Sequence, residues 1–287
     1  MKFLRVIFVF FLLFSNLYSS SVALKIGILY EKLFATKKEA TIGLKLWVKQ
    51  INESNYGNIE AEFYDDENKL IKDFKNNKIQ ILISDATLYY ENKKIIDEYR
   101  DIKWIMSRSE NIFTQFYLIK NSQSKIDFDN FDVKKIYYKE NMAKIWFDNI
   151  LLKSVKNKQT NFKLYEKIEK SKKLIFNVFF NKNDVSIISK DLYDSMSKLN
   201  PQIKSKIQII KKSKAIFFTG IGFSRKNLDK VHSGMMKKMT DDFSNSKKNF
   251  EVISFIDIQK IFLLKDGDLN ELDKFYKEYF KSKKIKK

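Results

Sequence analysis

The chain contains no cysteine, a single proline and a single histidine among its 287 residues. Without cysteine it can form no disulfide, and it lacks the residue that carries the lipid at a bacterial lipoprotein's processing site. A lone histidine without cysteines makes a poor metal site. The sequence also has no glycine-rich phosphate-binding loop. We therefore expect a fold held together by its apolar core, with no cofactor and no bound metal.

The most continuous apolar run lies at the N-terminus. Lys2 and Arg5 precede the run Val6–Phe14, and the small residues Ser21-Val22-Ala23 follow it. This order is typical of a secretory signal peptide covering residues 1–23. An uncleaved membrane anchor is the alternative, but a spanning helix needs ~20 apolar residues. No later run approaches that length, so we expect a soluble mature protein.

The sequence is basic, with 55 Lys and Arg against 35 Asp and Glu and a formal net charge of +20. Such an excess raises nucleic acid or an anionic membrane as a partner. Here acidic residues stand between the lysines almost everywhere, and only the tail Lys281–Lys287 is a dense block. We interpret the charge as solvated surface with a mild attraction for anions. We expect no nucleic-acid partner and no stable membrane insertion after signal cleavage.

The hydrophobic pattern predicts alternating strands and helices, which is typical of an α/β fold. A first series runs strand, helix, strand, helix, strand over residues 24–30, 39–51, 59–64, 68–77 and 79–84. A second series has strands at 114–120, 134–138 and 185–188, helices at 140–155 and 191–199, and an apolar segment of either kind at 173–180. Pro201 ends the helix at 191–199. Segments 206–210 and 215–224 read as strands, and the remainder, including 255–262, reads as helical.

One strand–helix pattern occurs twice. The segments Asn77–Tyr89, NKIQILISDATLY, and Asn181–Tyr193, NKNDVSIISKDLY, each place an apolar strand before a polar turn and a helix. They hold similar positions in the two series. In open α/β sheets, ligands bind at the edge where the strand C-termini gather. We interpret the repeat as two similar lobes, each ending a strand at a shared cleft.

In their order along the chain, these segments resemble the type II periplasmic solute-binding proteins, especially the phosphonate/phosphite/phosphate-binding branch of ABC transporter receptors. The resemblance covers nearly the whole mature chain. Leu24–Tyr30 resembles the family's first strand. Asn76–Tyr90 resembles its Gly-x-Val-Asp…Tyr segment, with Gln80 where Asp is usual and Tyr89 on the usual aromatic. Asn183–Ser213 is the closest match, with Asp184 on the family's aspartate.

The resemblance implies a two-lobed α/β fold with two mixed or parallel sheets, flanking helices and a hinge of two crossing strands. Lobe 1 would comprise residues 24–116 and 213–287, with the C-terminal helices packing back on it, and lobe 2 residues 117–212. The crossing strands would lie in 114–120 and 207–218. It also implies a non-enzymatic periplasmic receptor that captures a small solute, anionic in this branch, and delivers it to an ABC permease.

The sequence departs from this family at the turn after the strand 134–138. Phosphonate-binding members have a Ser/Thr-rich turn there, whose hydroxyl and N–H groups hold the anion. This chain has Lys139, Glu140 and Asn141 instead. Glu140 would repel a phosphoryl group, whereas Lys139 would favour an anion, so the solute stays open. This turn and Gln80 motivate an alternative hypothesis, a degenerate sensory subunit that binds a partner signalling protein such as a membrane-bound sensor.

Six residues at or near predicted strand ends are the candidate ligand-binding residues: Tyr30, Lys32, Tyr89, Lys139, Asn141 and Asp184. Tyrosines would stack on or hydrogen-bond the solute, with core packing as the alternative. Asp184 would accept hydrogen bonds, with a role in a turn as the alternative. We expect Asp85 to cap the next helix, and the cluster Asp65-Asp66-Glu67 to form a solvated turn. His232 is expected to lie at the surface or to take part in packing a lobe. No Ser-His-Asp set can be assembled, so no enzyme is expected.

Overall fold

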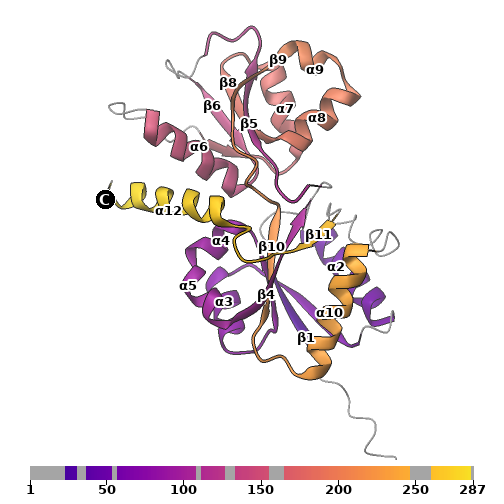
Figure 1. The fold of residues 1–287 in the computed structure, drawn as a ribbon. Helices are drawn as coiled ribbons and strands as arrows, with labels where there is room; N and C mark the ends of the chain where they lie inside the picture. The colour runs from indigo at the N-terminus through magenta and orange to yellow at the C-terminus, as the bar shows by residue number, and fades with distance from the viewer. Residues whose placement is uncertain are drawn as a thin grey trace, which may run out of the picture.

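The computed structural model describes residues 23–30, 37–53, 57–107, 111–126, 133–154, 165–245 and 260–285. These residues form two α/β lobes, each built around its own sheet (Figure 1). The segment predicted as a signal peptide lies outside the described residues up to residue 22. Lys32, one of the six candidate ligand-binding residues, also lies outside them.

The first lobe contains a six-stranded sheet in the order β11-β4-β10-β3-β1-β2. Its strands are β1 (Leu24–Leu29), β2 (Ile59–Tyr64), β3 (Ile81–Ser84), β4 (Arg100–Ser107), β10 (Gly220–Arg225) and β11 (Lys260–Leu263). Strand β1 pairs in parallel with β2 and β3, whereas β10 is antiparallel to β3 and β4. Strand β10 arrives from the far part of the sequence, so the lobe is discontinuous along the chain.

Helices cover both faces of this sheet. Helices α2 (Lys37–Glu53) and α10 (Lys230–Asn245) contribute to one apolar cluster, through Leu44 of α2 and Met236 of α10. On the other face lie α3 (Glu67–Lys75), α4 (Ala86–Glu91) and α5 (Lys93–Tyr99). Asp66 caps α3 and Asp85 caps α4, each accepting a hydrogen bond from a backbone N–H of the first turn. The predicted capping role of Asp85 is thus confirmed.

The second lobe contains a five-stranded sheet in the order β7-β6-β8-β5-β9. Its strands are β5 (Phe116–Asn121), β6 (Lys135–Tyr138), β7 (Tyr165–Lys167), β8 (Asp184–Ser189) and β9 (Ile207–Lys212), and its helices are α6 (Asn141–Ser154), α7 (Ser171–Phe180), α8 (Lys190–Leu199) and α9 (Gln202–Lys206). Strands β7, β6 and β8 are parallel, whereas β5 is antiparallel to β8 and to β9.

The two sheets repeat the same local arrangement. In the first lobe β3 lies between β1, which is parallel to it, and β10, which is antiparallel. In the second lobe β8 lies between the parallel β6 and the antiparallel β5. The repeated sequence segments contain β3 with the start of α4 and β8 with the start of α8. The repeat in the sequence therefore falls on equivalent strand–helix units of the two sheets.

Two extended segments, before β5 and after β9, join the lobes. They pair at Thr114 and Phe217, where each residue donates its backbone N–H to the other's carbonyl oxygen, at 2.7 and 3.3 Å. Adjacent residues of an extended chain point to opposite sides. Phe217 and Phe218 accordingly face different sides of this junction. Each of them lines a different one of the two cavities described below.

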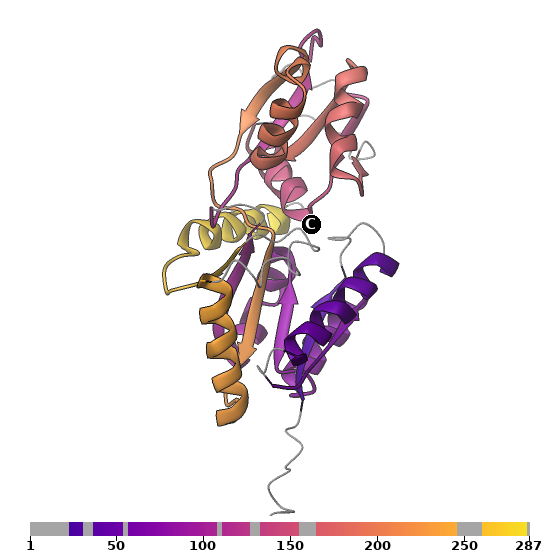
Figure 2. The same cartoon turned by 90° about the vertical axis from the view of Figure 1, so that its right-hand side faces the viewer.

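The C-terminal helix α12 (Asn270–Ile285) lies at the junction of the lobes (Figure 2). Tyr276 of α12 is buried, and its ring stacks on that of Tyr90 in α4 with 4.0 Å between centroids. On its other side α12 contacts α6 of the second lobe. The resemblance implied C-terminal helices packed on the first lobe; α12 packs on that lobe through Tyr276, and it also contacts the second lobe.

In three segments the structure departs from the predicted secondary structure or decides between the predicted alternatives. The segment 173–180, left open between strand and helix, lies in α7. Strand β4 was not anticipated. The helical interpretation of 255–262 is wrong where the structure describes it, because Lys260–Leu263 is the edge strand β11, paired antiparallel with β4. A four-residue strand shows too few alternations to be distinguished from a helix by periodicity.

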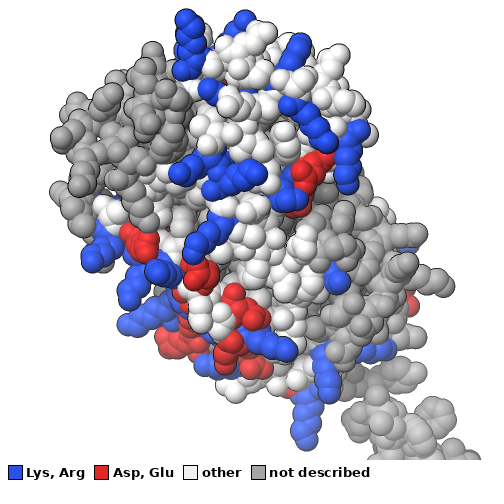
Figure 3. Space-filling model, turned by 45° about the horizontal axis from the view of Figure 1, so that its top comes forward, with Lys and Arg blue, Asp and Glu red and all other residues white. Residues whose placement is uncertain are grey.

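Basic side chains form separate groups on the face shown in Figure 3 and do not merge into one patch. Acidic side chains lie among several of these groups, and many of the ion pairs join exposed partners, such as Lys214 with Glu271. Among the residues that the structure describes, no helix combines the length and the apolarity needed to cross a membrane.

Gly222 of β10 leaves room for the indole of Trp104 on the neighbouring strand, and an added Cβ would overlap that ring. We expect Gly222→Ala to lower the free energy of unfolding by about 1–3 kcal/mol, because a packed ring would have to move. Gly234→Ala is the matched control, since nothing lies within 4 Å of its Cβ position in helix α10. That variant should raise the free energy of unfolding by up to about 1 kcal/mol. Urea titration of both proteins measures the difference, and equal stabilities would contradict the packing.

Candidate functional site

A cavity of about 230 Å³ lies where the second lobe meets the two crossing segments. We call it the hinge cavity. It is slightly smaller than the ~300 Å³ at which typical ligand pockets begin, so it suits a small solute. Its walls combine hydroxyls, carboxylates and an apolar side, and the lining residues are Thr114, Phe116, Glu140, Ser171, Leu174, Ser189, Asp191, Leu192, Ser195, Phe218 and Thr219.

Three strand–helix junctions build one side of the hinge cavity. Glu140 follows β6 and precedes α6, Ser171 opens α7 after β7, and Ser189 ends β8 before α8. Because β7, β6 and β8 are parallel neighbours, their C-terminal ends meet at one edge of the sheet. This is the edge at which open α/β sheets bind ligands.

The crossing segments close the other side of the cavity and hold it to the lobe. The Thr114 hydroxyl donates to Oδ2 of Asp191 at 2.9 Å, which ties the first turn of α8 to a crossing segment. The backbone N–H of Lys190 donates to the carbonyl of Gln115 at 2.8 Å. Ser189 caps α8, its hydroxyl oxygen accepting from the N–H of Leu192. The start of α8 is therefore fixed relative to the hinge.

Two of the six predicted residues lie beside this cavity without lining it. Lys139 donates its Nζ to the hydroxyl of Ser171 at 3.0 Å, and Ser171 lines the cavity. Asn141 is the first residue of α6, and its Oδ1 accepts from Lys167 at 3.1 Å. Glu140, between them, is the residue of this turn that lines the cavity. Tyr30, at the end of β1 in the other lobe, is half-buried, and its ring makes an edge contact with Phe63.

The structure places Asp184 away from the hinge cavity. It is the first residue of β8, whereas Ser189 at the other end of the strand lines the cavity. Five residue steps of ~3.3 Å put about 17 Å between them. Asp184 is buried and accepts a hydrogen bond from the Tyr137 hydroxyl at 3.0 Å. Burial and this hydrogen bond raise the pKa of Tyr137. The arrangement stabilises the core of the lobe.

Tyr89 lies in the core of the first lobe and not at its surface. It is 1% exposed, and its ring packs against Phe223 at 4.9 Å between centroids. Its hydroxyl donates to Asp97 at 3.1 Å and accepts from Lys93 at 2.7 Å. Arg100 adds a second cation on Asp97. We infer a structural role for Tyr89, since its side-chain hydroxyl is hydrogen-bonded within this network.

The predictions missed the residues that the structure brings together, among them Thr114, Ser171, Ser189 and Asp191. Ser189 and Asp191 did carry a signal, because they directly follow an apolar strand inside the repeated segment. Asp184, which matches the family's aspartate, lies at the start of that strand. Thr114 carried no local signal, since its contact with Asp191 spans 77 positions of the chain.

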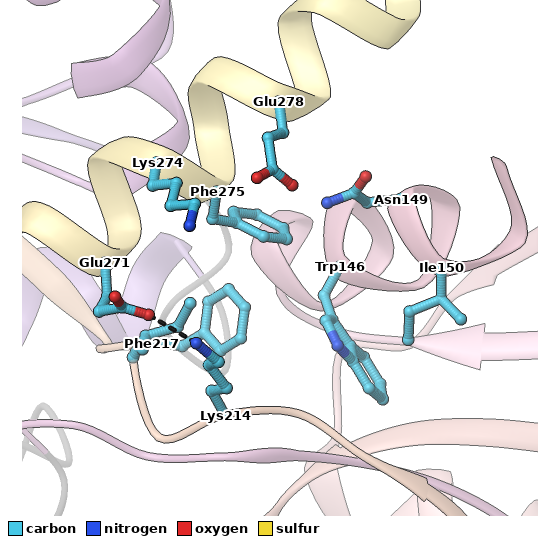
Figure 4. Close-up of a pocket in the computed structure, with 10 residues that line it drawn as sticks. Trp146, Asn149, Ile150, Lys214, Phe217, Glu271, Lys274, Phe275 and Glu278 are labelled. Atoms are coloured by element: carbon cyan, nitrogen blue, oxygen red, sulfur yellow. Dashed lines mark hydrogen bonds and ion pairs between the residues drawn. The ribbon is translucent and has the colours of Figure 1, made fainter. Parts of the chain in front are cut away.

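A second and larger cavity, of about 310 Å³, lies between α6, the segment after β9 and α12 (Figure 4). We call it the α12 cavity. Phe217 lines it, whereas Phe218 lines the hinge cavity. Five of its ten lining residues are aromatic or aliphatic, with Trp146 and Phe275 prominent, and the other five are polar or charged. At its rim Lys214 pairs with Glu271 at 2.7 Å. It lies away from the strand–helix junctions, so the hinge cavity is the better candidate site.

The described residues hold no group of three or more His, Asp or Glu side chains placed to bind a metal ion. Within the acidic cluster, Asp66 serves as the cap of α3. His232 is buried in α10, and its Nδ1 lies 2.8 Å from Oδ2 of Asp229. It does not line the hinge cavity.

Comparison with known proteins gives a fold but no sequence family. Neither a protein-family model nor a curated protein sequence matches the chain. Among solved structures, a binding protein component of an ABC phosphonate transporter from Pseudomonas aeruginosa is similar with a TM-score of 0.62 at 14% identity, over 91% of this chain and 87% of that chain. XAC2383 from Xanthomonas citri, bound to ATP, has a TM-score of 0.65 at 11% identity, over 92% and 99% of the two chains.

A third similar structure is PhnD1 from Prochlorococcus marinus in complex with methylphosphonate, with a TM-score of 0.59 at 10% identity, over 90% of this chain and 98% of that one. Identities this low establish the fold alone. The chain therefore has the two-lobed fold of type II periplasmic solute-binding proteins, and the predicted fold class and the resemblance are confirmed at this level.

The network around Tyr89 predicts a pH dependence of stability. Burial acts to raise the pKa of Asp97, but hydrogen bonds from Lys93 and Arg100 outweigh it and hold this pKa below its ordinary value. The ionised carboxylate therefore stabilises the fold above the unfolded-state pKa of ~3.9, and this contribution disappears as the pH falls through the lowered pKa. We expect the free energy of unfolding to fall less steeply below about pH 5 in Asp97→Asn than in the wild type.

Denaturant titrations at several pH values measure this slope. Asp101→Asn is the control, because Asp101 is exposed and should leave the slope as it is in the wild type. Equal slopes in the wild type and Asp97→Asn would show that the network contributes no pH-dependent stability.

Proposed function

We propose that this protein is a non-enzymatic periplasmic receptor, which binds a small solute in the hinge cavity and delivers it to an ABC permease. The observation that carries the proposal is the position of that cavity, at three strand–helix junctions and against both crossing segments. The fold shared with transporter binding proteins supports it. The basic and apolar N-terminal segment supports secretion with removal of residues 1–23. The sensory alternative gains no support from these relatives.

Binding would operate through the hinge. The described lining comes from the second lobe and the crossing segments, and none of it from β1, β2 or β3. A bound solute would therefore offer new contacts to the first lobe and shift the population toward a closed arrangement. In this proposal residues 24–116 and 213–287 form one moving body and residues 117–212 the other, with α12 bridging them.

The chemistry of the cavity supports binding in preference to catalysis. Its serine and threonine hydroxyls have no imidazole beside them to act as a general base, since His232 lies in α10. A few aimed polar groups and an apolar wall are sufficient to fix a small solute.

The proposal predicts that filling the hinge cavity removes solute binding. Ser195 is an exposed residue of α8 that lines the cavity, so Ser195→Trp should occupy its space without disturbing the core. A cognate solute should raise the stability of the wild type by RT ln(1 + [L]/Kd), about 2.7 kcal/mol at a hundredfold excess over Kd. Ser195→Trp should lose this gain. Thermal unfolding with a panel of small amines, polyols and oxyanions measures it.

The matched control is Ser205→Trp, on the exposed surface of α9 and outside the cavity, which should retain the full response. Native mass spectrometry of the purified protein complements the panel, because a retained solute would be seen directly. A response that survives Ser195→Trp would place binding elsewhere in the molecule.

A further inference from the structure

The hinge cavity has the opposite charge character to the chain as a whole. The sequence carries 55 Lys and Arg against 35 Asp and Glu. Among the described residues that line the cavity, however, Glu140 and Asp191 are carboxylates and none is Lys, Arg or His. A basic protein thus offers two negative groups and no positive one to the solute at its proposed binding site.

Asp191 is positioned by the hinge itself. Its Oδ2 accepts the hydrogen bond from Thr114, whose backbone is paired with Phe217. The described residues give its other oxygen, Oδ1, no hydrogen bond, and the residue is only partly buried where it lines the cavity. One carboxylate oxygen is therefore fixed, and the second is available to a ligand.

The start of α8 would ordinarily attract an anion, because free N–H groups and the helix dipole place partial positive charge there. Here two of the first three N–H groups of the helix already have partners, and a carboxylate lies in the same turn. Asp191 supplies a negative charge in the first turn, the N–H of Leu192 donates to Ser189, and the N–H of Lys190 donates to Gln115. An oxyanion at this end would lie beside a carboxylate.

Lys139 and Lys190 adjoin residues that line the cavity, and both already have partners. Lys139 donates to Ser171, which itself lines the cavity, and Lys190 forms an ion pair with Asp194 one turn along α8. Neither ammonium group lines the cavity. The predicted preference of Lys139 for an anion is therefore offset by Glu140, the adjacent residue, which does line it.

From these observations we infer that the hinge cavity takes a small solute with a protonated amino group, and not an oxyanion. This inference rests on the proposed solute-binding function. An ammonium group has only donors, and Asp191, Glu140 and the hydroxyl oxygens of Ser171 and Ser189 accept hydrogen bonds. Phe116 and Phe218 line the same space, and their ring faces also attract cations.

Putrescine and ethanolamine are the amine probes, methylphosphonate and phosphate the oxyanion probes, and xylitol the uncharged one. Isothermal titration of the mature chain should show binding of an amine and no binding of either oxyanion. Asp191→Asn keeps the shape of the side chain and an oxygen for Thr114, but it removes the charge. It should weaken amine binding at least about tenfold, the effect of losing a hydrogen bond to a charged group.

Glu140→Gln is a second variant, expected to weaken amine binding in the same direction. Asp184→Asn is the control, because it makes the same chemical change at the far end of β8 and should leave the affinity unaltered. Circular dichroism of each variant checks that it is folded.

The outcomes separate this inference from the proposed function. Binding of an oxyanion or of xylitol without any amine would overturn the amine preference and leave a solute receptor. Amine binding that is equally strong in the wild type, Asp191→Asn and Glu140→Gln would overturn the role of the carboxylates. Absence of binding by every probe, with no retained solute in native mass spectrometry, would overturn both.

Discussion

The pairing of Thr114 with Phe217 is the constraint on which the other features of this molecule depend. It joins the two segments that pass between the sheets and so fixes where one lobe begins relative to the other. Because adjacent residues of an extended chain point to opposite sides, Phe217 and Phe218 separate the α12 cavity from the hinge cavity. Thr114 also holds Asp191 through its hydroxyl. This pair of backbone hydrogen bonds therefore helps to position the residues of the hinge cavity on one side of the junction and those of the α12 cavity on the other.

The two lobes show how one topology gives different chemistry at equivalent places. In each lobe a central strand lies between a parallel and an antiparallel neighbour and leads into a capped helix. In the first lobe the cap, Asp85, is buried and turned to its own helix. In the second lobe the corresponding junction, at Ser189 and Asp191, lines a cavity. The fold provides the edge at which a ligand can bind, and the side chains decide which ligand that is.

The sequence predicted most of the fold because the spacing of apolar residues within each segment indicates whether it forms a helix or a strand. Strands β1, β2 and β6 and helices α2, α6 and α8 lie within a few residues of their expected positions. The candidate site was predicted less well. Lys139 and Asn141 flank the cavity, whereas Tyr89 is bound into a buried network and Asp184 lies at the end of its strand that is far from the cavity. Residue type and nearness to a strand end do not distinguish a side chain that faces the cleft from one that faces the core.

The amino-acid sequence by itself determined the class of fold, the order of its elements and the repeated strand–helix unit, since these depend on residues close together in the chain. Only the tertiary structure decided that β11 is a strand at the edge of the first sheet, that α12 contacts both lobes, and that Thr114 meets Asp191. Each of these is a contact between distant parts of the chain, and its energy depends on packing that no short window of sequence contains.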